Sequence, residues 1–116
     1  MKTYHFPIEA TLDVVGGKWK VVILCILLDG TKRTSEIKRA MPSITQKMLT
    51  QQLRELEADG IINRTIYKQV PPKVEYSLSE YGKSLTAVLD CMCDWGRNHI
   101  EEQLSEKERD NSKFQS

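Results

Sequence analysis

Apolar residues recur with a helical period through most of the chain and alternate with polar residues only in the region 61–78. Near the N-terminus, Ile8, Leu12 and Val15 are spaced by four and three residues, as on one face of a helix. The pair Gly16-Gly17 ends this pattern. The sequence therefore predicts a short amphipathic helix that begins near Ile8.

The next segment, VVILCILL (21–28), is apolar at every position. Its periodicity therefore cannot separate a buried helix from a buried strand. The β-branched residues favour a strand, whereas Trp19 before the segment and Asp29-Gly30 after it fit a short helix. We favour a helix that is buried on nearly all sides.

Two further helices are predicted in close succession after Gly30. Thr34 or Ser35 can cap the first, and Pro42 ends it. Its inward-facing residues are expected to be Ile37, Ala40 and Met41.

The second of these helices begins at Thr45, a favourable N-cap residue, and ends at Gly60. Its apolar residues recur at intervals of four and three, at Leu49, Leu53 and Leu56. Two helices joined by a short turn, of which the second is longer and apolar on one side, form a helix-turn-helix.

Residues 61–78 change to the alternating pattern of strands. The segments IINRTIY (61–67) and KVEYSL (73–78) are separated by a loop in which Pro71-Pro72 cannot join a ladder. They predict a β-hairpin with a stiff tip and with Lys68 and Lys73 at its base. A helix-turn-helix followed by a hairpin is the order of a winged helix, so the expected fold is mainly α with a small β-hairpin wing (α+β).

A last long helix is expected from Ser79, as its N-cap, to Gln103. Apolar residues follow each other at intervals of four and three along it: Tyr81, Leu85, Val88, Met92 and Trp95. Such a heptad-like seam suits packing against another helix, and a second copy of the chain is the expected partner. Residues 1–104 are expected to form one domain and the polar residues 105–116 a frayed tail.

Charge is unevenly distributed along the chain, although its net charge is only +1. Residues 31–76 carry nine Lys or Arg and five acidic residues, whereas residues 77–116 carry five basic and eight acidic residues. A local cationic excess suits contact with phosphates, although solvated patches of this charge are common too.

Opposite its leucines, the helix over 45–59 carries amides, a hydroxyl and cations: Gln46, Lys47, Thr50, Gln51 and Arg54. In the major groove Gln pairs with adenine, Arg or Lys pairs with guanine, and Thr packs against the thymine methyl. Glu55, Glu57 and Asp59 follow in the C-terminal half, expected to lie away from the groove. A solvated helix face is the alternative, but the adjoining helix, the basic hairpin and the charge distribution favour DNA.

The composition fits one globular domain of 116 residues, with 40% hydrophobic and 28% charged residues. The longest apolar run is far below the ~20 residues that span a bilayer, so a cytoplasmic location without membrane contact is expected. The sequence has no nucleophile elbow, no phosphate-binding Gly loop and no H-E-x-x-H motif, and therefore does not indicate an enzyme.

Three cysteines do not suggest a disulfide framework. Cys25 lies in the apolar run and is expected in the core. Cys91 and Cys93 are about 200° apart around a helix, so they cannot share a metal, and no metal or cofactor is expected. Oxidation of Cys91 or Cys93 at a dimer seam stays an alternative.

Three segments, GGKW (16–19), LTQQLRELEADGII (49–62) and VPPKVEYSL (70–78), closely resemble the HxlR-type winged helix-turn-helix regulators of bacteria, which are related to MarR-like repressors. The resemblance runs from about residue 7 to residue 99. It implies a homodimer built from the first and last helices, which brings Ile8 and Leu12 into the dimer interface. It also implies binding to a palindromic operator on double-stranded DNA and control of nearby genes.

The resemblance adds backbone contacts to the DNA-reading helix, with Arg33 and Ser35 on phosphate and Lys68 and Lys73 on the wing. The complete expected DNA-binding set is Arg33, Ser35, Thr45, Gln46, Lys47, Thr50, Gln51, Arg54, Lys68 and Lys73. One departure concerns redox sensing, since family members that sense oxidants resemble one another in a cysteine where HFPIE has Phe6. A thiol switch of that design is therefore not expected.

The sequence leaves two alternative functions and one further partner open. A winged-helix module that binds protein is disfavoured by the cations and amides of 45–59, because protein-binding surfaces are depleted in Lys. A redox-responsive regulator would use Cys91 or Cys93. The apolar space between the wing domain and the dimer helices could admit a small-molecule effector, but no polar cluster marks a pocket.

Overall fold

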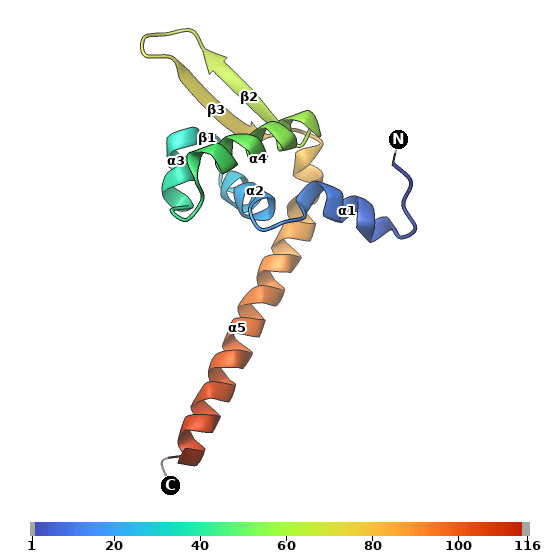
Figure 1. Cartoon of the computed structure of the whole chain (residues 1–116), viewed down its shortest axis with the longest axis vertical. Helices are drawn as coiled ribbons and strands as arrows, with labels where there is room; N and C mark the ends of the chain where they lie inside the picture. The colour runs from blue at the N-terminus through green and yellow to red at the C-terminus, as the bar shows by residue number, and fades with distance from the viewer. Residues whose placement is uncertain (1, 115–116) are drawn as a thin grey trace. The chain divides into compact units, whose positions relative to one another are not determined.

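The computed structural model describes residues 2–114, and the side chains of residues 2–108 (Figure 1). Four helices and three strands precede a 3-10 turn and a final helix. In chain order they are α1 (Pro7–Val15), α2 (Lys20–Leu28), β1 (Lys32–Arg33), α3 (Thr34–Ala40), α4 (Gln46–Ala58), β2 (Ile62–Tyr67), β3 (Lys73–Leu78), η1 (Gly82–Leu85) and α5 (Thr86–Phe114).

The chain divides near the start of α5 into two compact units, one that ends at Thr86 and one that begins at Ala87. The first unit contains the helix-turn-helix and the hairpin, so the predicted winged-helix order is confirmed. The assignment of residues 1–104 to a single domain stays a prediction.

The apolar segment 21–28 forms a helix, as favoured by its flanks and not by its β-branched residues. Ile23 and Leu24 are completely buried, and Leu27 nearly so. Burial explains the result, because the tertiary packing of these residues outweighs a strand propensity of roughly a few tenths of a kcal/mol per residue. The expectation that α2 is buried on nearly all sides is too strong, since Val22 is 40% exposed. The core of the first unit consists of Val15, Ile23, Leu24, Leu27, Ile37, Met41, Ile44, Leu49, Leu53, Leu56, Ile61 and Ile62.

The start of α3 differs from its prediction in the residue that caps it. The expected caps Thr34 and Ser35 are the first residues of the helix, and the Arg33 N–H donates to the Glu36 carboxylate over 2.9 Å. A carboxylate in the first turn satisfies a free N–H and favours the positive end of the helix dipole. Ala40, expected to point inward, is exposed, because the helix ends there and the chain turns at Met41.

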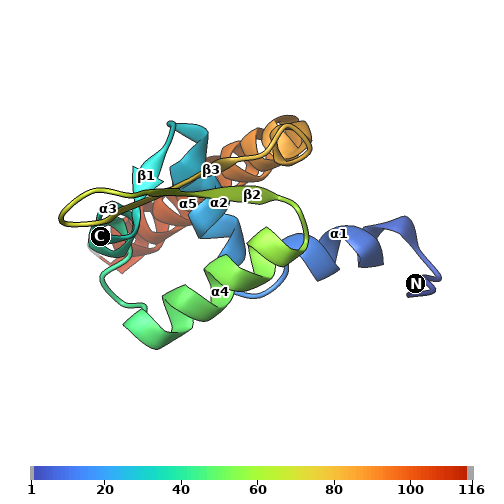
Figure 2. The same ribbon diagram turned by 90° about the horizontal axis from the view of Figure 1, so that it is seen from above.

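A three-stranded antiparallel sheet carries the wing, in the order β1-β3-β2. The long strands pair from Ile62 opposite Leu78 to Tyr67 opposite Lys73. The two residues of β1 pair with Tyr76 and Glu75 of β3. Sequence patterning missed β1, because two residues are too few to establish an alternation. Figure 1 shows the hairpin tip beyond α3 and α4, and the view from above in Figure 2 shows α4 along one side of the hairpin.

Ser79 joins the end of β3 to the end of α4. Its hydroxyl donates to the Gly60 carbonyl over 2.6 Å and accepts from the Gly82 N–H over 2.8 Å. Gly60 has a φ of +74°, which suits glycine at this helix end. A Cβ at Gly82 would overlap the carbonyl oxygen of Ile61, so this position requires glycine.

The last helix therefore begins differently from the prediction. The Ser79 hydroxyl accepts from the Gly82 N–H at the first residue of the 3-10 turn η1, and the α-helix starts only at Thr86. At its other end α5 continues to Phe114, beyond the expected end at Gln103 and into the segment predicted to fray. Among the described residues, no helix combines the length and the apolar character needed to cross a bilayer.

Candidate nucleic-acid interface

Helix α4 has one buried and one exposed face. Leu49, Leu53 and Leu56 are at most 2% exposed and hold the helix against the core of the first unit. On the other face, a surface hollow is lined by Gln46, Lys47, Thr50, Gln51, Arg54 and Glu55. The structure thus brings together the five polar residues that the helical spacing predicts on one face, and it adds Glu55.

The predicted N-cap of α4 is confirmed. The Thr45 hydroxyl oxygen accepts from the Met48 N–H over 3.1 Å. This bond fixes the first turn of α4, from which the free N–H groups at the helix N-terminus point outward. An N-terminus of this kind favours phosphate through its dipole.

Thr50 uses its hydroxyl hydrogen within the helix, where Oγ1 donates to the Gln46 carbonyl over 2.9 Å. The hydroxyl oxygen can therefore only accept a hydrogen bond from a further partner. Its methyl group remains available for apolar contact, which is the contribution expected of Thr next to a thymine methyl.

Lys47 and Arg54 are the uncommitted cations of this face. Both are exposed, and within residues 2–108 neither side chain makes a hydrogen bond or an ion pair. A cation without an internal partner loses none when it binds an external acceptor. The face can therefore donate to base edges or phosphates at little cost.

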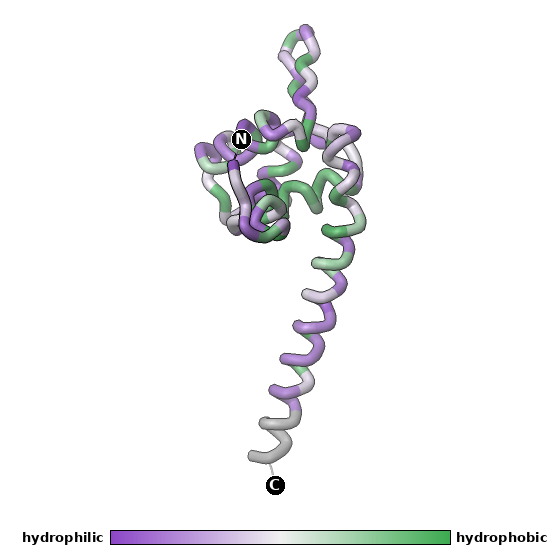
Figure 3. Tube along the Cα trace, turned by 90° about the vertical axis from the view of Figure 1, so that its right-hand side faces the viewer, coloured by the Kyte–Doolittle hydropathy of each residue, from purple (hydrophilic) through white to green (hydrophobic). Residues whose placement is uncertain are grey.

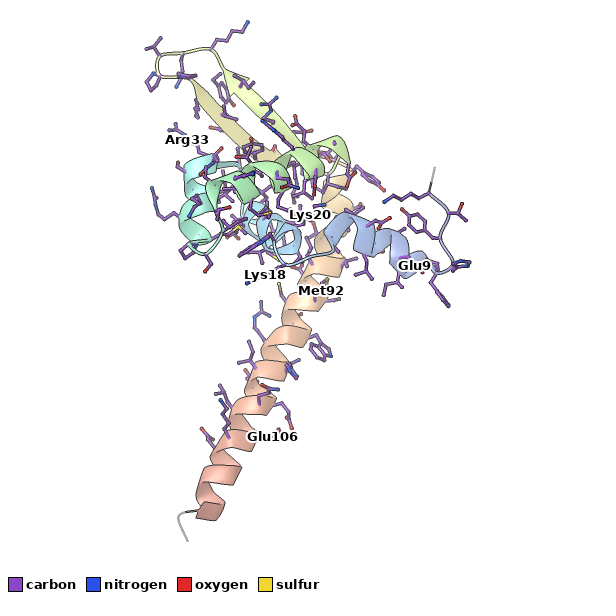
Figure 4. The ribbon with its side chains drawn as sticks, in the orientation of Figure 1. Glu9, Lys18, Lys20, Arg33, Met92 and Glu106 are labelled. Atoms are coloured by element: carbon purple, nitrogen blue, oxygen red, sulfur yellow. The ribbon has the colours of Figure 1, made fainter. Side chains whose placement is uncertain are left out.

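Glu55 differs from the prediction that the acidic residues of α4 lie away from this face. Its carboxylate lies 2.7 Å from the ammonium of Lys20 and accepts from Gln51 Nε2 at 3.4 Å. Lys20, and then Gln51, hold the pKa of the Glu55 carboxyl below its usual range. Sequence reasoning missed Lys20, because only the packing of α2 against α4 brings it there. Figure 4 labels Lys20 at the start of α2.

The wing residues Lys68 and Lys73 have different surroundings. Lys68 follows β2 in the exposed loop, whereas Lys73 lies 2.6 Å from the Glu75 carboxylate and 5.0 Å from the centre of the Tyr67 ring. The charge of Lys73 is therefore largely compensated within the wing. At the tip, Val70 is fully exposed.

Arg33 and Ser35, the expected phosphate contacts, lie next to each other where β1 leads into α3. Both side chains are exposed, and Arg33 is labelled in Figure 4. In the strand register Arg33 lies opposite Glu75, whose carboxylate forms an ion pair with Lys73.

The residues predicted at the dimer interface remain uncovered in the single chain. In the first unit, Ile8, Leu12 and Tyr81 are 65%, 56% and 69% exposed, and Leu85 is half-buried. In the second unit, the exposed large apolar residues of α5 are Val88, Met92, Trp95, Ile100 and Leu104. Ile100 and Leu104 were not predicted, because the spacing of four and three residues continues from Trp95 to His99 and Glu102 and does not include them. Figure 3 shows hydrophobic residues interrupting the hydrophilic length of α5.

Cys25 lies on α2, and Cys91 and Cys93 lie on α5. Cys25, expected in the core, is half-buried, as is Cys93, whereas Cys91 is exposed. Within the described part of the chain, no cluster of three or more His, Cys, Asp or Glu side chains could hold a metal ion.

Comparison with known proteins adds to this geometry. The model of the HxlR-like helix-turn-helix family matches residues 14–104, which is most of the chain. The chain belongs to the HxlR-like family. Several relatives of this chain are helix-turn-helix transcriptional regulators by name, so the predicted family and the winged-helix fold are confirmed.

The HxlR-like chain is 72% identical over 99 residues to the transcriptional regulator YtcD of Bacillus subtilis. The alignment covers 85% of this chain and 79% of YtcD. A crystal structure of YtcD superposes with a TM-score of 0.79 and 70% identity, over 83% of this chain and 98% of that one. The redox regulator HypR in its reduced form superposes with a TM-score of 0.82 and 54% identity, over 86% of this chain and 99% of that chain.

Proposed function

We propose that this HxlR-like regulator works as a homodimer that reads a pseudo-palindromic operator with the exposed face of α4. The single observation that carries the proposal is the hollow on the exposed face of α4, which is lined by Lys47 and Arg54 together with the amides of Gln46 and Gln51. An exposed helix face with cations, amides and a threonine methyl, and with its apolar face fixed in a core, matches the chemistry of the major groove.

Each residue of the face has a chemical role in this proposal. Arg54 and Lys47 donate to guanine O6 and N7, the Gln amides pair with adenine, and Thr50 packs its methyl against thymine. Thr45 contributes by fixing the helix N-terminus, where backbone N–H groups meet a phosphate.

Backbone contacts come from residues that flank α4. Arg33 and Ser35 lie at the start of α3, and Lys68 and Lys73 lie on the wing, which follows the backbone or the minor groove. These contacts fix the register of the protein on DNA without reading sequence. Because Lys73 is paired with Glu75, Lys68 is the stronger candidate of the two.

Dimerisation through α1 and α5 would cover the exposed apolar residues of these helices, including Leu12, Met92 and Trp95. A two-fold dimer places two copies of α4 in successive major grooves about 34 Å apart, so the operator is expected to be pseudo-palindromic. Binding of a small-molecule effector and a cytoplasmic location stay predictions from the sequence.

Selection of bound duplexes from a random pool at physiological salt tests the proposal. A consensus with two inverted half-sites, whose centres lie about ten base pairs apart, supports a dimeric regulator that reads bases with α4. Variants in which Arg54 or Gln51 is changed to Ala should lose the preference at particular positions of each half-site. Enrichment of no sequence, with binding only at very low salt, would favour the protein-binding module instead.

A response to oxidants is a second candidate, supported by the similarity to HypR, a redox regulator, and by the exposure of Cys91. Phe6 stands where a cysteine of that kind of sensor is expected, so the response would rely on Cys91 or Cys93. Mass spectrometry after mild oxidation would reveal a modified or dimer-linked thiol. Unchanged thiols in a protein that still binds its operator would remove this candidate.

A further inference from the structure

Three side chains from two helices form a chain of polar contacts at the edge of the α4 face. The ammonium of Lys20 lies 2.7 Å from Oε2 of Glu55, and Oε1 of Glu55 accepts from Nε2 of Gln51 over 3.4 Å. The Lys20 side chain is only 13% exposed, whereas the Glu55 side chain is 43% exposed. The well-buried cation thus holds a carboxylate that reaches the surface beside Gln51.

An ionised carboxylate can only accept hydrogen bonds. Since Lys20 and Gln51 both favour the charged form of Glu55, this carboxylate stays an acceptor near neutral pH. The Gln51 amide must therefore turn its NH2 group toward Glu55. Its carbonyl oxygen and its second N–H are left for an external partner. An unconstrained glutamine would populate both orientations, because the terminal amide torsion is broad.

We propose that Lys20 and Glu55 are positioning residues that fix the orientation of the Gln51 amide and so determine which base it accepts. This rests on the proposed role of Gln51 in reading bases. A carbonyl oxygen presented to the major groove requires an amino group there, which adenine N6 or cytosine N4 supplies. Adenine also offers N7 to the second N–H of the amide, so adenine is the expected base.

Two substitutions of Glu55 separate orientation from charge. Alanine releases the Gln51 amide and should broaden its base preference. In Glu55→Gln, Lys20 holds the new carbonyl oxygen, so the new NH2 group faces Gln51 and reverses its amide. Gln51 then presents NH2, and the preference at that position should shift toward guanine or thymine, which carry carbonyl oxygens.

The experiment measures binding to four duplexes that carry each base pair at the position affected by Gln51→Ala, within the site selected from the random pool. A bidentate amide contact discriminates about 5- to 150-fold between bases, so Glu55→Ala should reduce the preference at this position at least about threefold. Lys20→Met should reduce the base preference at the same position. Lys20→Arg should retain the preference, because arginine can still hold the carboxylate.

Glu57→Ala is the matched control. It removes the same charge from the same helix, but Glu57 faces Arg64 at 3.5 Å and not Gln51. Both alanine variants should raise the affinity for all duplexes to a similar extent by removing a negative charge near DNA. Only Glu55→Ala should change the ranking of the four duplexes.

The outcomes distinguish the inference from the proposed function. If Gln51→Ala changes no base preference, the assignment of Gln51 as a reading residue is wrong, and the inference is wrong with it. If Gln51→Ala changes the preference but Glu55→Ala, Glu55→Gln and Lys20→Met do not, the proposed function stands and the positioning role is overturned. In a Gln51→Ala background, Glu55→Ala should have no further effect on that position. Far-UV circular dichroism and the midpoint of unfolding check whether each variant is folded.

Discussion

The ammonium of Lys73 lies between two partners on the wing itself, 2.6 Å from the Glu75 carboxylate and 5.0 Å from the centre of the Tyr67 ring. The side chains of Lys73 and Glu75 are 27% and 19% exposed. A lysine held in this way must give up its carboxylate partner, or share it, before it can neutralise a phosphate. The wing therefore carries less available positive charge than its sequence suggests.

Removing the carboxylate should free this lysine. We expect Glu75→Gln to strengthen binding to all duplexes and to steepen the logarithmic salt dependence of the dimer by about two units, because one more phosphate is neutralised in each half-site. Titrations at several salt concentrations check this. In the double variant Glu75→Gln with Lys73→Ala the steeper slope should disappear. An unchanged slope in Glu75→Gln alone would show that Lys73 does not reach the backbone.

Arg54 should behave in the opposite way, as a residue that specifies sequence. It is exposed and, within residues 2–108, makes no internal ion pair, so Arg54→Ala breaks none. We expect the variant to lose about 1–3 kcal/mol of discrimination at one base pair in each half-site, with little loss of stability. Binding to single-base variants of the selected site measures this. If affinity and preference both stay intact, the exposed face of α4 is not the reading surface.

The salt dependence of the unmodified protein tests the extent of backbone contact. If the dimer neutralises about six phosphates, its affinity should fall by about 10³-fold or more between 50 and 200 mM salt. A fall of less than about tenfold would mean that Arg33, Lys68 and the first turn of α4 do not act together on the backbone. Measurements with a selected and a scrambled duplex separate base reading from this general attraction.

The exposed face of α4 could be predicted from the sequence, because Leu49, Leu53 and Leu56 fix which side of the helix is buried. The cap at Thr45 could also be predicted, because it depends only on residues that are close in the sequence. The role of Glu55 could not, since its contact with Lys20 depends on how α2 packs against α4. Strand β1 was missed because pairing with β3, and not its own two residues, makes it a strand.

The cap of α4 should contribute to the stability of the whole protein. Thr45→Ala leaves the Met48 N–H without its acceptor and should lower the free energy of unfolding by about 1 kcal/mol. Thr45→Ser should restore most of it. Ser43→Ala is the control, because within residues 2–108 the exposed Ser43 hydroxyl makes no hydrogen bond. Chemical denaturation at one fixed protein concentration gives the comparison, since a dimer adds a concentration dependence. Equal effects of Thr45→Ala and Ser43→Ala would contradict the role of the cap.

The N-terminal segment should add a pH-dependent element to stability. Tyr4 Oη donates to Asp13 over 2.7 Å, and Lys2 Nζ lies 3.4 Å from the same carboxylate. The bond from Tyr4 holds the pKa of Asp13 below its usual range, and it raises the pKa of Tyr4. A carboxyl group whose pKa is lowered by folding stabilises the protein above its unfolded pKa. This contribution is lost as the pH falls through the folded pKa. A tyrosine whose pKa is raised stabilises below its unfolded pKa, and this contribution is lost as the pH rises through the folded value.

Tyr4→Phe should therefore lower the stability by a small amount that is constant between these two pH limits. At acidic and at strongly alkaline pH the unmodified protein loses this stabilisation as well, so the variant should then be equally stable. Thermal unfolding of the variant and of the unmodified protein, followed from acidic to alkaline pH, measures the difference. The two curves should converge where Asp13 is protonated in the folded protein, because the Tyr4 bond then no longer distinguishes them. Because both groups are exposed, the difference should be small at every pH. A gap between the curves that persists at strongly acidic pH would show that Tyr4 stabilises the segment through packing and not through its bond to Asp13.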